Sequence, residues 1–142
     1  MKKSILVLCT GNSCRSQMAE GYLKSYNSEL EVYSAGTKPA SSVNPNSVKV
    51  MDEIGIDISS QYPKDVDEFT SKSFDFVITV CDNAKEVCPV FTGEVKHRIH
   101  LPFEDPANAT GTEEEIIAVY RKVRDEINEK FRRFYETEIM HA

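Results

Sequence analysis

The sequence predicts an α/β fold with an open, mostly parallel four-stranded sheet and helices on both faces. Apolar runs of strand length alternate with segments whose apolar residues recur at helical spacing. The 142 residues are enough for one domain, 1–142, with a core of its own, and we find no internal repeat. We therefore expect a three-layer αβα domain whose ligands bind outside the carboxyl ends of the strands.

The first half of the chain alternates strand and helix twice. Residues 5–8 are a continuous apolar run, which predicts a buried strand, and an apolar stripe through residues 18–26 predicts the helix that follows. Residues 31–36 predict a second strand that ends at a glycine. Residues 44–55 begin with an N-cap asparagine and a proline and end in glycine, which predicts a second helix.

The second half supplies two more strands and a long helix. We predict a short extended piece at 56–60, a single helical turn within 65–71 and a third strand at 74–80. Residues 95–101 predict a fourth strand, and their polar side chains favour an edge position. The last helix starts at a capping box of Thr112 and Glu115 and holds its apolar stripe for about five turns. The stripe consists of Ile116, Tyr120, Val123, Ile127, Phe131 and Phe134.

The segment between the first strand and the first helix, CTGNSCRS at residues 9–16, has the composition of an oxyanion-binding loop. Gly11 and Asn12 accept the unusual backbone angles of a turning loop, so the N–H groups of residues 10–15 can converge on one tetrahedral anion. Arg15 adds a bidentate donor. The predicted oxyanion-binding residues are Thr10, Gly11, Asn12, Ser13, Cys14, Arg15 and Ser16.

Cys9 lies at the floor of this loop and is the candidate nucleophile. We expect the helix dipole, the inward N–H groups and the Ser16 hydroxyl to favour its thiolate. The alternative for an isolated cysteine after a strand is an inert buried side chain, but five residues separate Cys9 from Arg15 at a strand-to-helix turn, which favours catalysis. Cys14 is expected to point away from the anion and to take no part.

Cys81 follows the third strand, and Cys88 lies seven residues later. If residues 81–88 are helical, the two Cα atoms are about 10 Å apart, whereas a disulfide needs them within about 7 Å. A disulfide between them therefore requires the segment to rearrange. Two buried structural cysteines are one alternative. A zinc site is another, although the spacings of the cysteines do not match those of structural zinc.

Asp105 is the candidate general acid. It precedes Pro106, whose ring keeps the aspartate extended and able to turn its carboxyl group over the neighbouring loop. A carboxylic acid beside a bound anion can protonate a departing oxygen. The adjacent Glu104 competes for this role, and an Asp-Pro pair is also an ordinary turn signal.

Composition limits the partners and the compartment. A net charge of -6 argues against nucleic acid or an anionic membrane as a main partner. No apolar run approaches the roughly 18 residues of a spanning helix, so we expect a cytoplasmic protein. No exposed apolar stripe or coiled-coil pattern calls for a second copy, so we expect a monomer.

These motifs resemble the low-molecular-weight protein tyrosine phosphatase superfamily, and most closely its thioredoxin-coupled arsenate reductase branch. The resemblance spans almost the full chain: CTGNSCRSQMAEG at 9–21, VYSAG at 32–36, VNP at 43–45, IDIS at 56–59, TVCDNAKEVCP at 79–89 and FEDP at 103–106. It implies a flavodoxin-like three-layer fold. The paired cysteines distinguish the reductases from the phosphatases.

The resemblance implies a relay of three thiols. Cys9 attacks arsenate held by the loop and Arg15, with Asp105 as acid. Cys81 then attacks Cys9 and releases arsenite, and Cys88 attacks Cys81 to leave a disulfide that thioredoxin reduces. Phosphate and sulfate are expected to compete for the loop, and no cofactor is implied.

A potassium ion is bound by some members of this branch, for which the matching ligands are Asn12, Glu20 and Ser34. Lys64 stands where an acidic residue is expected, so its ammonium can replace the cation and we predict no metal.

Two other functions compete with arsenate reduction. One is hydrolysis of phosphotyrosine or small phosphate esters, for which Cys9, Arg15 and Asp105 suffice. The other is a redox switch in which Cys81 and Cys88 sense oxidation.

Overall fold

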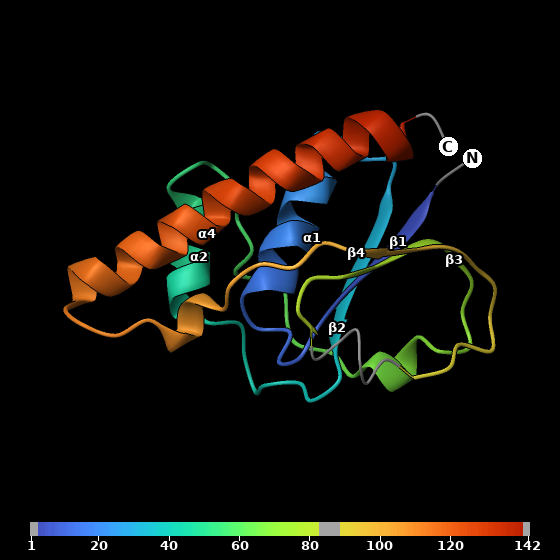
Figure 1. The fold of residues 1–142 in the computed structure, drawn as a ribbon, viewed down its shortest axis with the longest axis horizontal. Coiled ribbons are helices and arrows are strands. Elements are labelled where there is room, and N and C mark those ends of the chain that lie inside the picture. Colours follow the sequence, from blue (N-terminus) through green and yellow to red (C-terminus); the bar gives the residue numbers. More distant parts are fainter. Residues whose placement is uncertain (1–2, 83–88, 141–142) are drawn as a thin grey trace.

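The computed structural model describes residues 3–82 and 89–140 (Figure 1). Four parallel strands form one sheet in the order β2-β1-β3-β4. The strands are β1 (Ser4–Cys9), β2 (Glu31–Gly36), β3 (Phe74–Thr79) and β4 (Val95–His100), and the helices are α1 (Arg15–Tyr26), α2 (Pro45–Asp52) and α4 (Glu113–Phe134). Short 3-10 helices η1 (Val66–Glu68) and η2 (Pro106–Asn108) and a π-helical turn η3 (Tyr135–Ile139) complete the described elements.

The predicted α/β fold with a four-stranded parallel sheet is confirmed. Every predicted strand is present, and β4 lies at the predicted edge. The predicted turn within 65–71 is η1, which begins at a capping box. The segment predicted as a short extended piece at 56–60 lies outside the sheet and closes in a turn, in which Ser59 N–H donates to Asp57 Oδ1. The predicted helix at 81–88 falls largely outside the described residues.

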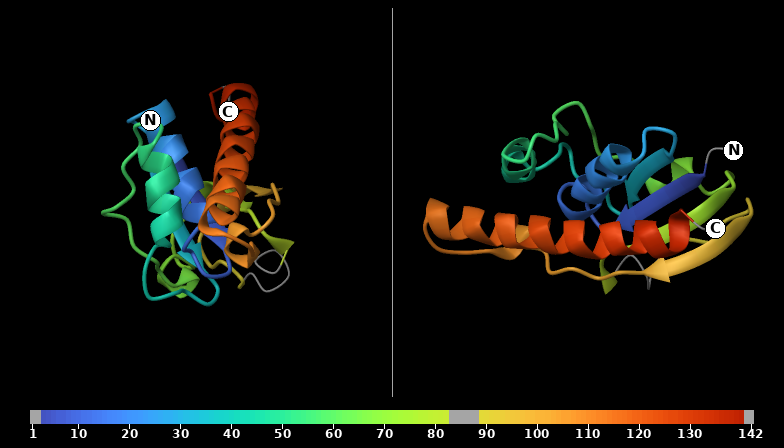
Figure 2. Two further views of the ribbon diagram at one scale, coloured as in Figure 1. Left: turned by 90° about the vertical axis from the view of Figure 1, so that its left-hand side faces the viewer. Right: turned by 90° about the horizontal axis from the view of Figure 1, so that it is seen from above.

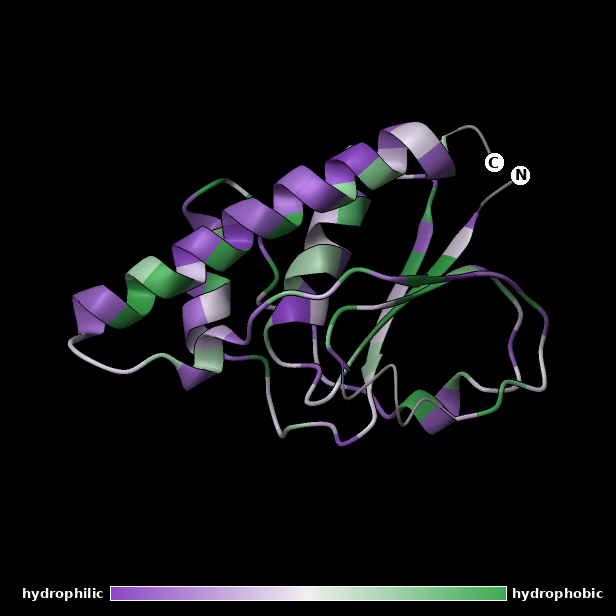
Figure 3. Cartoon of the chain, in the orientation of Figure 1, coloured by the Kyte–Doolittle hydropathy of each residue, from purple (hydrophilic) through white to green (hydrophobic). Residues whose placement is uncertain are grey.

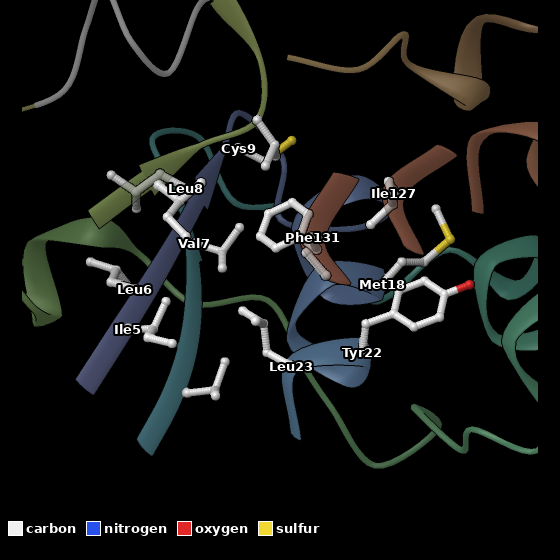
Figure 4. Packing of buried hydrophobic residues seen from close by; sticks show 14 of the residues in the cluster. Ile5, Leu6, Val7, Leu8, Cys9, Met18, Tyr22, Leu23, Ile127 and Phe131 are labelled. Atoms are coloured by element: carbon white, nitrogen blue, oxygen red, sulfur yellow. The ribbon is translucent and has the colours of Figure 1, made fainter. Parts of the chain in front are cut away.

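The two faces of the sheet are covered differently. Helices α1 and α4 pack together over one face, and α2 contacts both of them beyond its edge (Figures 1 and 2). Figure 4 shows Val7 on the side of β1 that faces Phe131, and Leu8 on the opposite side, toward η1. That second face carries η1 and an aromatic cluster of Tyr33, Phe69, Phe74 and Phe91. Each face is therefore closed by its own apolar contacts.

The long helix α4 begins as predicted. Thr112 Oγ1 accepts from Glu115 N–H, and Glu115 Oε1 accepts from Thr112 N–H, both at 3.2 Å. Hydrophilic and hydrophobic residues alternate along its ribbon (Figure 3). The predicted stripe packs against the core, with Ile116 and Phe134 only half-buried, and Ile117, which it left out, is buried as well. Arg124 also lies on the buried side, where its Nη1 donates to Val50 O and so ties α4 to α2.

The strand order places a topological switch point at the carboxyl end of β1. The chain passes from β1 to β2 on one side and later returns to β3 on the other. Crevices at such points bind ligands in open α/β sheets. The loop that follows Cys9 lies at this point, as predicted. Among the described residues, no helix is long and apolar enough to cross a membrane.

Candidate active site at the carboxyl edge of the sheet

The loop between β1 and α1 turns its carbonyl groups outward. Each carbonyl from Cys9 to Cys14 accepts a hydrogen bond: four from backbone N–H groups in segment 37–44, one from Gln17 Nε2 and one from Met18 N–H. In a trans peptide the carbonyl and the following N–H point in opposite directions. The N–H groups of residues 10–15 therefore face the inside of the loop, where they form a concave surface of partial positive charge that suits an oxyanion.

Asn12 fixes the conformation of the loop from within. It is fully buried and has a φ of 53°, in the left-handed region that asparagine tolerates better than most residues. Its Oδ1 accepts from Lys64 N–H at 2.9 Å, and its Nδ2 donates to Ser16 Oγ at 2.8 Å and to Ser34 Oγ at 2.9 Å. The side chain thus joins the loop to α1, to β2 and to the segment before η1. Among the described non-glycine residues, Asn12 alone has a positive φ.

Arg15 is held over the loop with one donor still available. Its Nη1 donates to Phe103 O at 3.0 Å, and its Nη2 lies 3.5 Å from Asp105 Oδ2. Within residues 3–82 and 89–140, its buried Nε has no hydrogen-bond partner. A buried N–H without a partner costs free energy, and an oxyanion in the loop can provide the missing acceptor.

The structure separates the two acidic candidates. Asp105 faces Arg15, and its Oδ1 caps η2 by accepting from Ala107 N–H at 3.0 Å. Glu104 turns the other way and pairs with Lys122 on α4 at 3.0 Å. The position of Asp105 beside the oxyanion loop therefore favours it over Glu104 as the proton donor.

The side chains of Cys9 and Cys81 interact at the base of the loop. Both are buried, their side chains are hydrogen-bonded to each other, and Cys81 Sγ lies 3.3 Å from Thr10 Oγ1. The hydrogen bond to Cys81 raises the pKa of Cys9, burial raises it further, and the charge of Arg15 and the Thr10 N–H oppose these effects only in part. This arrangement therefore opposes the expected thiolate of Cys9, because the Cys81 side chain accepts a hydrogen bond from the Cys9 thiol.

Cys14 does not join this pair in the described structure. The thiol of Cys14 lies 3.8 Å from Ser13 Oγ, within hydrogen-bond distance, and burial raises its pKa. That Cys14 is a spectator stays a prediction, and its backbone belongs to the loop. Cys88 lies outside the described residues.

The three potassium candidates form one buried hydrogen-bonded group. Ser34 Oγ donates to Glu20 Oε1 at 2.6 Å and accepts from Asn12 Nδ2. Two ammonium groups approach the Glu20 carboxylate: Lys24 Nζ at 2.5 Å from Oε2 and Lys64 Nζ at 4.0 Å from Oε1. The carboxylate charge is thus balanced by two lysines, of which Lys24 is the nearer, and the replacement of the cation by Lys64 stays a prediction. In the described part of the chain, no group of three or more His, Cys, Asp or Glu side chains could hold a metal ion.

Sequence reasoning missed the groups that support the loop. Segment 37–44 binds four of its carbonyls, and Gln17 binds a fifth while also donating to Tyr62 O. Segment 37–44 has no periodicity that indicates such a role. Gln17 is fully buried on the first turn of α1, and its polarity at a core position was the one available signal.

The fold and this loop define a family. The family model for low molecular weight phosphotyrosine protein phosphatase matches residues 4–141, so the chain belongs to that family. Among its relatives, an arsenate reductase of Halalkalibacterium halodurans is 54% identical over 137 residues, covering 96% of this chain and 97% of the relative.

Two solved structures are similar in fold. An arsenate reductase in the phosphate binding state superposes with a TM-score of 0.77 at 31% identity, covering 93% of this chain and 95% of the other. The thioredoxin-dependent arsenate reductase Cg_ArsC1' of Corynebacterium glutamicum gives a TM-score of 0.67 at 29% identity, covering 99% of this chain and 64% of the other.

Gly36 provides a test of the loop geometry. A Cβ at this position would lie 2.5 Å from Thr10 O and 3.1 Å from Asn12 Cβ. We expect Gly36→Ala to displace the loop and to weaken phosphate binding, measured by titration calorimetry, by about tenfold to a hundredfold. Gly55→Ala is the control, because its φ of 81° makes alanine strained but nothing lies within 4 Å of the added Cβ. It should lower thermal stability and leave phosphate affinity unchanged. Equal phosphate affinity in wild type and Gly36→Ala would contradict the described geometry.

The thiol pair gives a second prediction. Cys81→Ala removes the largest cause that raises the pKa of Cys9, so its thiolate should form at lower pH and iodoacetamide should alkylate it faster near neutral pH. Cys81→Ser keeps a hydrogen-bond acceptor and should leave the pKa of Cys9 raised. The measurement is the pH dependence of alkylation at Cys9, followed by peptide mass mapping. An unchanged midpoint in Cys81→Ala would show that Cys81 does not control this proton.

Proposed function

We propose that this chain is an arsenate reductase that passes electrons through Cys9, Cys81 and Cys88 and receives them from thioredoxin. The observation that carries the proposal is the contact between the buried thiols of Cys9 and Cys81 beside an oxyanion loop. Ester hydrolysis needs a nucleophile, an arginine and an acid, and has no use for a second thiol against the first. Full-length arsenate reductase relatives above 50% identity support the same reading.

In the first step, arsenate binds the inward N–H groups and the free Nε of Arg15. Cys9 Sγ attacks arsenic, an S–As bond forms, and one oxygen departs as water. Asp105, beside Arg15, supplies a proton to that oxygen. The proton of Cys9 must leave during this step, and an arsenate oxygen beside Cys9 Sγ is the acceptor.

In the second step, Cys81 passes its proton to an oxygen of the arsenyl group, and the resulting thiolate attacks Cys9 Sγ. An S–S bond forms and the S–As bond breaks, so the bonding pair passes to arsenic, which is reduced from the +5 to the +3 state and leaves as arsenite. The 3.3 Å contact between Thr10 Oγ1 and Cys81 Sγ can direct a hydroxyl hydrogen bond to the attacking thiolate. Cys81 needs no long movement, because it already touches Cys9.

In the third step, Cys88 attacks Cys81, which restores Cys9 and leaves a disulfide between Cys81 and Cys88. The support for this step is the sequence spacing and the thioredoxin-dependent solved relative, since Cys88 lies outside the described residues. A protein reductant needs an accessible disulfide, and the buried Cys9–Cys81 bond is a poor target. We place the reaction in the cytoplasm, where thioredoxin keeps thiols reduced, and propose that the chain acts as a monomer.

Phosphate-ester hydrolysis is the second candidate, favoured by the family model and by the loop itself. Cys9, Arg15 and Asp105 can form and protonate a phosphoryl adduct just as they would an arsenyl one. We expect slow hydrolysis of p-nitrophenyl phosphate even if arsenate is the physiological substrate.

The relay predicts the behaviour of single-cysteine variants in arsenate-dependent NADPH oxidation coupled to thioredoxin and thioredoxin reductase. Wild type should turn over, and Cys9→Ser, Cys81→Ser and Cys88→Ser should each lose multiple turnover. Cys81→Ser and Cys88→Ser should keep p-nitrophenyl phosphate hydrolysis, which serves as the internal control for the loop. Turnover by Cys88→Ser at the wild-type rate would overturn the three-thiol relay, and turnover by both pair variants would point to a low-molecular-weight thiol.

The acid assignment predicts a contrast between neighbouring residues. Asp105→Asn removes the proton donor beside Arg15 and should lower kcat for arsenate by about a hundredfold or more. Glu104→Gln breaks only an exposed pair with Lys122 and should change kcat less than about twofold. Steady-state kinetics of the two variants under identical conditions makes the comparison. Similar losses in both variants would show that Asp105 is not the acid.

A further inference from the structure

His100, the last residue of β4, connects the residues on either side of Cys81. Its Nδ1 lies 2.7 Å from Thr79 Oγ1 and its Nε2 lies 2.9 Å from Asp82 Oδ1. We propose that His100 is a positioning residue for Cys81, holding the Cys81 thiol against Cys9 for the disulfide-forming step. This inference rests on the proposed function, and nothing in the oxyanion loop or the relay itself requires it.

The direction of these hydrogen bonds follows from the donors available. The Asp82 carboxylate only accepts, so Nε2 carries a proton. In the neutral ring, the Thr79 hydroxyl donates to Nδ1. In the protonated ring, Nδ1 donates to Thr79 Oγ1, whose own hydrogen can turn to Ile99 O at 3.4 Å. His100 therefore connects Thr79 and Asp82 in both protonation states.

The backbone before Cys81 is anchored in the sheet. Val80 N–H donates to Leu8 O at 2.9 Å, and Val80 O accepts from Phe103 N–H at 3.1 Å. Beyond Cys81, the described structure shows the contact of Asp82 with His100 as the next restraint. The backbone at Cys81 is thus restrained on both sides, by the sheet before it and by a side chain of the neighbouring strand after it.

The energetics favour positioning over stability as the role of this contact. The Asp82 side chain is 83% exposed, and exposed pairs contribute little to folding free energy. The rate at which one positioned sulfur attacks another is far more sensitive to this contact, because a displacement of about 1 Å can lower a reaction rate by up to about a hundredfold. Loss of the contact should therefore slow disulfide formation much more than it lowers stability.

Two conservative variants separate the two contacts. His100→Gln places an amide nitrogen near the position of Nε2 and can still donate to Asp82, whereas His100→Asn reaches only toward Thr79. In a Cys88→Ser background, where the Cys9–Cys81 disulfide accumulates, we expect His100→Asn to slow its formation after arsenate addition about tenfold and His100→Gln to stay within about threefold of the parent. His97→Asn, an exposed histidine on the same strand, is the matched control and should match the parent.

The measurement is rapid acid quench followed by mass spectrometry of the Cys9–Cys81 disulfide, with p-nitrophenyl phosphate hydrolysis assayed in parallel. Hydrolysis uses Cys9 but not Cys81, so it should be unchanged in His100→Asn. Equal disulfide rates in His100→Asn and the parent, or a parallel loss of hydrolysis, would overturn the inference.

A second arm with diamide separates this inference from the proposed function. Diamide takes two electrons and two protons from the thiol pair and needs no arsenate. A parent that forms the disulfide with diamide but not with arsenate refutes arsenate reduction. The order of the histidine variants with diamide still decides whether His100 positions Cys81.

Discussion

The active site depends on one constraint, which is that every carbonyl of the loop from Cys9 to Cys14 is hydrogen-bonded away from the loop centre. An isolated loop gains nothing by aligning its N–H groups, because parallel dipoles repel. Here the repulsion between the aligned N–H dipoles is offset by the hydrogen bonds that the loop carbonyls accept from segment 37–44 and Gln17. The oxyanion site is therefore a property of the surrounding segments as much as of the loop, and it exists before any anion binds.

Asn12 extends that constraint into the core. Its side chain makes three hydrogen bonds, to Ser16, to Ser34 and from the Lys64 backbone N–H, and the network continues to Glu20. Buried networks of this kind specify one arrangement when every member is satisfied, and they are costly when one is missing. The left-handed backbone of Asn12 is tolerable because the rest of the network holds it there.

The sequence allowed the strands, the helices and the loop to be predicted because each has a local signature. The apolar run of β1, the capping box of α4 and the spacing of Cys9 and Arg15 need no knowledge of distant residues. The supporting groups could not be found this way. These contacts depend on how the elements pack. They include the bonds from segment 37–44 to the loop carbonyls, the pair of Glu104 with Lys122 and the contact of His100 with Asp82. The raised pKa of Cys9 was missed for the same reason, since its first cause is a thiol 72 positions further along the chain.

The contact between Cys9 and Cys81 has opposite effects on the two halves of the proposed reaction. A hydrogen bond to Cys81 stabilises the protonated form of Cys9, which makes it a poorer nucleophile in the first step and also less open to adventitious oxidation. The same closeness favours the second step, because the two sulfur atoms that must form the disulfide are already held near each other. A hydrolase would gain by losing the second thiol, because water would then complete the reaction on a more reactive cysteine. In the proposed reductase, contact with Cys81 slows the attack of Cys9 on the oxyanion. The same contact speeds formation of the disulfide, through which two electrons pass to arsenic.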